Sequence, residues 1–409
     1  MECSADGSTM KLAIASIHDL NDVRRGSGTF HYMIEELERQ GHSVIRLGPF
    51  QFEVPICTRV IGALHRWQGR RHVVFLDPFV GKRTGIQVFR RLAGLDYDIL
   101  LTKDLSMAAF TPTCKPVVVY TDVMITADYS EKHLPGCRLG NMSKISLALC
   151  RRTFRQALNR CTMAAFPAEW SAQAARSYCR EPGKIKVIPF GANVADPGPE
   201  IARGRRWDNV RRKGCINLLF VGVDWVRKGG DIAVETVARV NARGIKARLH
   251  VVGVKPPEEI APDQILSYGF LDKSKADDLR VLNRLYAESD VFILPSSNEG
   301  YNNSILMAAA FGLPTLAYDA NGVRDAVAGG SAGLLVPLGS SGEVFAEAIR
   351  TWQTQPSAYE ALAWGARRHY ETKANWRTSV RTLIECIENS LRVPHLKQTL
   401  SSDVAVRPA

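Results

Sequence analysis

The most informative feature of this 409-residue sequence is one carboxylate and the turn that follows it. Glu299 comes after the apolar segment Val291–Leu294, which is typical of a buried β-strand. A short helix is expected to begin next, at Asn302 or Asn303, because asparagine side chains cap free backbone amides. A negative group would then lie beside a helix N-terminus at the carboxyl end of a strand. Open α/β sheets bind ligands at that edge, and helix amides there attract phosphate.

Two adjacent cations, Arg227 and Lys228, occupy the corresponding place in an earlier strand–helix unit. They follow the predicted strand Asn217–Val221 and precede Gly229 and a predicted helix. A diphosphate is bound by fixed positive charge together with amides that point the same way. A solvated loop is the simpler explanation of such a turn. The presence of Glu299 in the same half of the chain favours the phosphate interpretation.

A glycine-rich turn is the candidate anion site of the first half. Gly26, Ser27 and Gly28 follow the predicted strand Leu12–Ile17, and glycines let backbone amides approach an anion closely. A tight strand–helix connection explains the same residues about as well. The turn is not the Gly-x-Gly-x-x-Gly pattern of a nicotinamide site.

The elements that must position these residues alternate between short apolar segments and longer amphipathic ones, the βαβ pattern of a parallel sheet covered by helices. The predicted strands are Leu12–Ile17, Ser43–Leu47, Ile99–Thr102, Val117–Thr121, Thr162–Phe166, Ile185–Pro189, Asn217–Val221, Arg248–Val252, Val291–Leu294, Thr315–Tyr318 and Gly333–Val336. The predicted helices are Thr29–Gln40, Ser143–Asn159, Ala168–Tyr178, Gly229–Asn241, Leu279–Glu288, Asn303–Phe311, Val344–Thr354 and a helical region over Tyr359–Leu391. The polar stretch Asn193–Gly214 separates two sets of elements. We therefore predict an α/β protein of two doubly wound, Rossmann-like domains that face each other across a ligand-binding cleft.

Length and composition agree with two ordinary globular domains, since 45% of the residues are hydrophobic and 23% are charged. No segment approaches the ~18 uninterrupted apolar residues of a membrane span, and the N-terminus lacks a basic-then-apolar signal pattern. The nine cysteines are scattered and include no Cys-x-x-Cys pair, so neither a disulfide framework nor a zinc site is indicated. We expect a cytoplasmic protein.

The formal charge of +12 favours anionic partners, and one region concentrates it. Residues 59–91 carry eight arginines and lysines against one acid, Asp77, with Trp67 and three phenylalanines interleaved. A basic, aromatic surface of this kind suits an anionic membrane. The alternative is the solvated face of an ordinary helix pair. Nucleic acid is not expected as a partner, because no known nucleic-acid-binding pattern accompanies the charge.

The Glu299 segment resembles the donor-sugar signature of the family 4 (group 1) retaining glycosyltransferases, a Glu-Gly-aromatic loop followed by a small-residue helix that ends in Gly-Leu-Pro. Further motifs match in order from about residue 11 to 337: Ser27-Gly-Thr, Gly41-His42, Glu169-Trp170-Ser171, Val187–Asn193, Phe220-Val-Gly222 with Lys228-Gly229, Gly269–Asp272 and Asn321–Asp325. The resemblance implies a GT-B fold. Its expected parts are an acceptor domain (1–192), a nucleotide-sugar domain (193–372), a helix crossing back to the first domain (373–392) and a disordered tail (393–409).

The resemblance implies transfer of a sugar from a nucleotide diphosphate donor to a glycan, lipid-linked or small-molecule acceptor, with retention of configuration and without a metal or other cofactor. The implied catalytic residues are Glu299, Lys228 and Asp122, which ends the strand at 117–121 and would position the acceptor hydroxyl. The implied donor-binding residues are Ser27, Gly28, Arg227, Lys228, Glu299, Gly300, Tyr301, Asn302, Asn303, Ser304 and Met307. A strand-end cap is the alternative role of Asp122. The basic region at 59–91 would place the enzyme on the inner face of the plasma membrane.

One position departs from the family pattern, which has a second glutamate eight residues after the first. Here that position is Met307, whereas the family's glutamate bonds the nucleotide ribose. A hydrogen bond to a charged group contributes about 1.5–3 kcal/mol, so donor binding should be weaker by roughly ten- to a hundredfold. Two alternatives stay open: a catalytically impaired, glycosyltransferase-like binding protein, and a GT-B nucleotide-sugar epimerase or phosphorylase.

Overall fold

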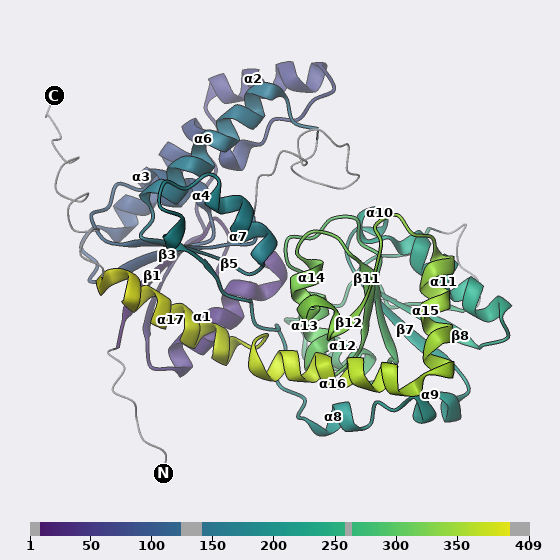
Figure 1. The fold of residues 1–409 in the computed structure, drawn as a ribbon. Helices are drawn as coiled ribbons and strands as arrows, with labels where there is room; N and C mark the ends of the chain where they lie inside the picture. The colour runs from purple at the N-terminus through teal and green to yellow at the C-terminus, as the bar shows by residue number, and fades with distance from the viewer. Residues whose placement is uncertain (1–8, 124–140, 258–263, 393–409) are drawn as a thin grey trace, which may run out of the picture.

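The computed structural model describes residues 9–123, 141–257 and 264–392. They form two lobes, each built on a six-stranded parallel sheet with helices on both faces (Figure 1). This is the predicted α/β architecture of two doubly wound domains. The tail expected at 393–409 lies outside the described residues.

The N-terminal sheet has the strand order β2-β1-β3-β4-β5-β6. Its strands are β1 (Lys11–Ala15), β2 (Ser43–Leu47), β3 (Ile99–Thr102), β4 (Val117–Tyr120), β5 (Met163–Phe166) and β6 (Ile185–Val187). After β2 the chain returns past β1 to build the other half of the sheet. The strand order therefore reverses between β1 and β3, where open α/β sheets bind their ligands.

The C-terminal sheet repeats this plan in the order β12-β11-β10-β7-β8-β9. Its strands are β7 (Ile216–Val221), β8 (Ala247–Val252), β9 (Ile265–Ser267), β10 (Val291–Leu294), β11 (Thr315–Tyr318) and β12 (Gly333–Val336). Here the order reverses between β7 and β10. These are the two strands that precede the cation pair and the glutamate singled out above.

Helices cover both sheets and join the lobes (Figure 1). They are α1 (Thr29–Arg39), α2 (Ile56–Trp67), α3 (Pro78–Leu92), α4 (Leu105–Phe110), α6 (Lys144–Arg160), α7 (Glu169–Arg176), α8 (Glu200–Arg203), α9 (Trp207–Lys213), α10 (Trp225–Lys228), α11 (Gly230–Ala242), α12 (Ala276–Glu288), α13 (Asn303–Ala310), α14 (Val323–Ala326), α15 (Gly342–Thr354), α16 (Pro356–Thr372) and α17 (Trp376–Arg392). Short 3₁₀ turns are η1 (Arg25–Gly28), η2 (Val74–Leu76), η3 (Pro182–Lys184) and η5 (Ala328–Gly330).

All eleven predicted strands are present, with ends that differ by at most two residues. The sequence analysis missed β9, which has only three residues and too little pattern to show a period of two. The helical region predicted at the C-terminus is two helices, because Thr372 ends α16 and Trp376 begins α17.

The stretch at 193–214 is more ordered than its polar composition indicated, since it contains α8 and α9. The buried side chain of Arg205 donates hydrogen bonds to the carbonyl oxygens of Phe311, Ser289 and Tyr286 at 2.5–2.7 Å. Trp207 is buried too, and packs edge-on against Tyr359. These long-range contacts fix a segment that local composition marks as a loop.

The two lobes share one hydrophobic core, which runs from β1 to α13 and α17. Figure 1 shows α17 leaving the C-terminal lobe after α16 and lying along the N-terminal lobe, where it contacts α1 and β5. At the junction, the ring of Phe190 lies between Tyr301 and Trp376, with centroids 6.0 Å from each.

Candidate functional site

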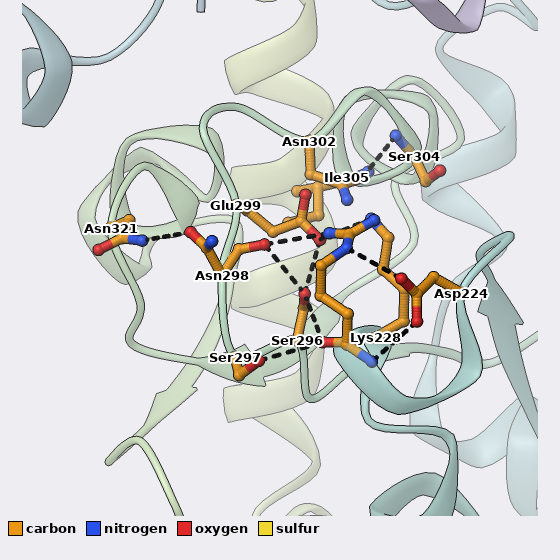
Figure 2. A network of polar contacts seen from close by, with 11 residues as sticks. Asp224, Lys228, Ser296, Ser297, Asn298, Glu299, Asn302, Ser304, Ile305 and Asn321 are labelled. Carbon is orange, nitrogen blue, oxygen red and sulfur yellow. Dashed lines mark hydrogen bonds and ion pairs between the residues drawn. The ribbon is translucent and has the colours of Figure 1, made fainter. Parts of the chain in front are cut away.

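The carboxylate of Glu299 is buried and bound by three donors (Figure 2). Its Oε1 accepts hydrogen bonds from Lys228 Nζ at 2.5 Å, Ser296 Oγ at 2.6 Å and Arg227 Nη1 at 3.1 Å. Glu299 and the two cations therefore form one cluster, although about 70 residues of chain separate them. The sequence analysis predicted both sides of this cluster and missed Ser296.

The backbone of two adjacent loops brings these side chains together at the switch point between β7 and β10. After β7, Asp224 caps the one-turn helix α10 by accepting from the Arg227 amide. Gly229 then ends α10 with φ of +75°, and a Cβ there would lie 2.0 Å from the carbonyl oxygen of Pro295. Only glycine allows the loop after β7 to approach the loop after β10 so closely.

Burial and charge oppose each other at this cluster. Burial by itself would raise the pKa of Glu299, but the charges of Lys228 and Arg227 and the hydrogen bonds to the carboxylate outweigh it. The pKa of Glu299 therefore lies below its ordinary value. Burial lowers the pKa of Lys228, and Glu299 opposes that shift. The carboxylate is thus held ionised, which suits a hydrogen-bond acceptor and does not suit a general acid.

The loop after Glu299 leads into α13 as the sequence predicted. Asn302 caps the helix, because its Oδ1 accepts from the amides of Ser304 at 2.8 Å and Ile305 at 3.3 Å. Tyr301 is buried against Phe190, and burial raises the pKa of its hydroxyl. Among the described residues no group hydrogen bonds to that hydroxyl.

Met307, the residue that departs from the family pattern, is fully buried on α13. Its sulfur lies 3.4 Å from Nζ of Lys273, a residue that the sequence analysis did not identify. Burial lowers the pKa of Lys273 to about 8. No carboxylate of the described residues pairs with this amine. Its neighbour on α13 is instead the thioether of Met307.

The glycine-rich turn of the first half is joined to α13 through one buried asparagine. Asn193 Nδ2 donates to the carbonyl oxygen of Ser27 at 2.7 Å, and its backbone amide donates to Asn303 Oδ1 at 3.2 Å. Gly26, Ser27 and Gly28 all have positive φ. Ser27 and Asn303 are therefore held together by the residues that connect the lobes.

Asp122 lies opposite Glu299 across the junction of the lobes. A Cβ on Gly300 would lie 2.8 Å from the carbonyl oxygen of Asp122 and 3.6 Å from its Oδ2. Burial raises the pKa of Asp122, and the charge of Glu299 adds to the shift, whereas Lys103 opposes it. A strand-end aspartate predicted from the first half thus faces the loop between β10 and α13 of the second.

Lys103, near Asp122, is a candidate site residue that sequence reasoning missed. It follows β3 directly, so the rule that identified Glu299 after β10 would have found it. Its Nζ lies 5.6 Å from the ring centroid of Phe30 and 3.3 Å from where a Cβ on Gly26 would be. No acid of the described residues forms an ion pair with it.

Two arginines beside the glycine-rich turn form ion pairs with a neighbouring acid. Arg24 and Arg25 lie 2.8 Å and 3.8 Å from carboxylate oxygens of Asp22. In the described part of the chain, no three side chains of the metal-binding types gather into a candidate metal site. The helices described there also include none with the length and apolar character needed to cross a membrane.

Comparison with known proteins gives a family match that lies within the second lobe. Residues 215–355 match the sequence model of the family described as glycosyl transferases group 1. The D-inositol 3-phosphate glycosyltransferase of Geodermatophilus obscurus is 31% identical over 231 residues, which are 53% of this chain and 50% of that protein. The enzyme of the same name from Rhodococcus opacus is 28% identical over 237 residues, with the same coverage. The chain thus spans about half the length of the curated relatives it matches.

Solved structures match over nearly the whole chain at low identity. Anabaena Alr3699/HepE in complex with UDP-glucose has a TM-score of 0.62 and 16% identity, covering 93% of this chain and 100% of that one. WaaG, a glycosyltransferase involved in lipopolysaccharide biosynthesis, has a TM-score of 0.59 and 18% identity, covering 92% and 99%. At these identities the likeness establishes the fold, which is GT-B.

Proposed function

Because residues 215–355 match the sequence model of the group 1 glycosyltransferases, we propose that the chain belongs to that family and transfers a sugar from a nucleotide diphosphate donor to an acceptor with retention of configuration. The acceptor would be a glycan, a lipid-linked molecule or a small molecule. The observation that carries the proposal is the cluster of Glu299, Lys228 and Arg227 at the β7/β10 switch point, with Asp122 facing it from the other lobe.

In this proposal Lys228 and Arg227 bind the donor diphosphate, together with the amides at the start of α13. Glu299 binds hydroxyls of the donor sugar. All three hydrogen bonds to Glu299 from the described residues reach Oε1, so in this proposal Oε2 accepts from hydroxyls of the donor sugar. The diphosphate would bind the same two cations as Glu299. The negative charge of Glu299 would therefore affect how strongly Lys228 and Arg227 bind the leaving group.

The proposed step breaks the bond between the anomeric carbon and the diphosphate oxygen while the acceptor oxygen bonds that carbon from the same face. The acceptor proton passes to an oxygen of the leaving phosphate, and Lys228 and Arg227 stabilise the negative charge that develops there. Asp122 orients the acceptor hydroxyl. Retention follows because entry and departure occur on one face.

The acceptor is proposed to carry an anionic group, such as a phosphate. Lys103 supports this, since its ammonium is near Asp122 and has no acidic partner among the described residues. The names of the relatives, D-inositol 3-phosphate glycosyltransferases, make phosphorylated polyols the first acceptors to test. The UDP-glucose complex of the Anabaena protein makes UDP-sugars the first donors.

A donor screen followed by product analysis tests the function. UDP-, GDP- and ADP-sugars would be compared by thermal stabilisation, since a ligand at 100 times its Kd stabilises a protein by about 2.7 kcal/mol. We expect one nucleotide class to stabilise the protein, nucleotide to be released only with acceptor present, and NMR of the product to show the donor's anomeric configuration. Full turnover by Glu299→Gln would remove the assigned role of that residue, and an inverted product would overturn retention.

A second candidate, a glycosyltransferase-like protein that binds a ligand without turnover, is favoured by the contact between Lys273 and Met307. Met307 stands where the family pattern has the glutamate that bonds the ribose. Calorimetry with UDP, GDP and ADP discriminates between the candidates, because the binding protein would show no affinity for any of them at millimolar concentration.

A further inference from the structure

Helix α2 has one face that packs against the fold and an apolar face that does not. Thr58, Gly62 and His65 point inward and are buried. The opposite face carries large apolar side chains at i, i+4, i+8 and i+11 with these exposed fractions: Ile56 79%, Val60 53%, Leu64 54% and Trp67 85%. Scattered exposed apolar residues are ordinary, but a continuous stripe along one helix marks an interaction surface.

The inner face of α2 fixes the direction of this stripe. His65 hydrogen bonds Ser143 Oγ at 3.0 Å, and the amide of Arg71, just after the helix, donates to the carbonyl oxygen of Asn141 at 2.9 Å. Figure 1 shows α2 at the outer end of the N-terminal lobe, away from the junction with the C-terminal lobe. The stripe therefore faces outward from a firmly held helix.

Arginines border the stripe on one side. Arg59 and Arg66 lie seven residues apart, so they share a face of α2 next to the apolar one. With Arg71 and His72 they line a surface groove of about 480 Å³. Nε of Arg59 donates to the carbonyl oxygen of Val54. The exposed acid just before the helix, Glu53, lies 3.8 Å from Arg83 and pairs with neither Arg59 nor Arg66.

The one acid within 59–91 does not neutralise this charge. Asp77 is buried, where it bonds His72 at 2.9 Å and caps α3 through the amide of Phe79 at 2.8 Å. The surface around the stripe is thus cationic. A second copy of the chain would bring the same cations to such a contact, which charge repulsion disfavours.

We propose that α2 docks the protein on an anionic lipid bilayer. Ile56, Val60, Leu64 and Trp67 enter the boundary between head groups and acyl chains, and the arginines of the groove bind lipid phosphates through their planar guanidinium groups. This binding goes beyond the proposed function, because it needs neither donor nor acceptor. It would hold the acceptor side of the N-terminal lobe near a membrane.

Vesicle co-sedimentation of the full chain tests the proposal. We expect binding to phosphatidylcholine vesicles that contain phosphatidylglycerol, and binding at least tenfold weaker to phosphatidylcholine alone. The variant Ile56→Ser/Leu64→Ser/Trp67→Ser should lose at least tenfold in affinity for the anionic vesicles. Arg59→Gln/Arg66→Gln should lose affinity too and should show less dependence on salt.

Trp364→Ser is the matched control, because Trp364 is a half-exposed tryptophan on α16 of the other lobe and should bind vesicles as the unmodified chain does. Thermal unfolding of each variant verifies the fold. Unchanged vesicle binding by the triple variant overturns the proposal. A dimer of the unmodified chain in ultracentrifugation, if the triple variant abolishes it, would also overturn the proposal, because α2 would then bind a second copy. Stabilisation by nucleotides is measured separately, so a failure of docking is distinguishable from a failure of the proposed transferase function.

Discussion

Nζ of Lys228 lies 2.5 Å from Oε1 of Glu299, and both side chains are buried at the point where the strand order of the second sheet reverses. The sequence analysis assigned the lysine to the diphosphate and the glutamate to the sugar. Their direct contact means that one compact site, and not two separate ones, would hold both parts of a donor.

The first prediction concerns the charge balance of the buried pair. Glu299→Gln leaves Lys228 and Arg227 without their buried counter-charge, and breaking such a pair costs about 3–5 kcal/mol. We expect urea unfolding to show a loss of that size in the free energy of unfolding. Glu347→Gln, which breaks the exposed pair with Arg350, is the control and should change stability little. Equal stability of the two variants would contradict the account of the cluster.

The second prediction is a pH dependence that arises at His369. Burial and the charge of Lys373 lower the pKa of this buried histidine to about 4. Between pH 6.5 and 4 the unfolded chain binds the proton and the folded chain does not, so stability falls as the pH is lowered through this window. The loss should reach about 3 kcal/mol near pH 4. Urea titrations at several pH values should show a shallower slope for His369→Phe, and an unchanged slope would contradict the prediction.

The third prediction distinguishes two costs of replacing a glycine by alanine: steric contact of the new Cβ with a neighbouring loop, and a left-handed backbone. Gly229 and Gly244 have nearly the same φ, +75° and +76°, but only at Gly229 would a Cβ meet another atom within 4 Å. Gly244→Ala should cost about 1–2 kcal/mol from the left-handed backbone alone. Gly229→Ala should cost more and should also weaken nucleotide binding, because it pushes the Lys228 loop away from Pro295. Calorimetry and chemical unfolding measure the two effects, and equal costs would exclude the steric argument.

The fourth prediction restores the family's acid. Met307→Glu places a carboxylate beside Nζ of Lys273, where it can pair with the amine and reach a nucleotide ribose. We expect nucleotide to bind roughly ten- to a hundredfold more tightly, as calorimetry would measure. Met307→Leu, which keeps the position apolar, should leave the affinity unchanged. Weaker binding by Met307→Glu would mean that the ribose lies elsewhere.

The fifth prediction concerns the asparagine that joins the lobes. Asn193 accepts from Trp376 Nε1 at 2.9 Å and donates to the carbonyl oxygen of Ser27 at 2.7 Å. Asn193→Asp removes the donor and sets a charged oxygen against a carbonyl, so unfolding should become easier by more than about 2 kcal/mol. Asn209→Asp alters a similar bond at an exposed site, to the carbonyl of Gly204, and should have a small effect. Matching effects would show that Asn193 does not hold the lobes together.

The sequence by itself determined the eleven predicted strands and the candidate residues Glu299, Arg227 and Lys228, but not the helices α2, α3 and α4. Strand limits were predictable because apolar runs and turn residues act within a few positions, and the cap at Asn302 is a local hydrogen bond. Glu299 and Lys228 were identifiable for a related reason, since each lies in the connection that follows a strand, five residues after β10 and seven after β7.

Tertiary structure alone decided which of these residues meet. Local pattern does not reveal that the loop after β7 lies against the loop after β10, that Asp122 faces Gly300, or that Lys273 reaches Met307. The order around Arg205 and the outward stripe of α2 were also hidden, because burial depends on residues distant in sequence. Side-chain types encode what chemistry is available, whereas strand order and packing set the distances at which that chemistry can act.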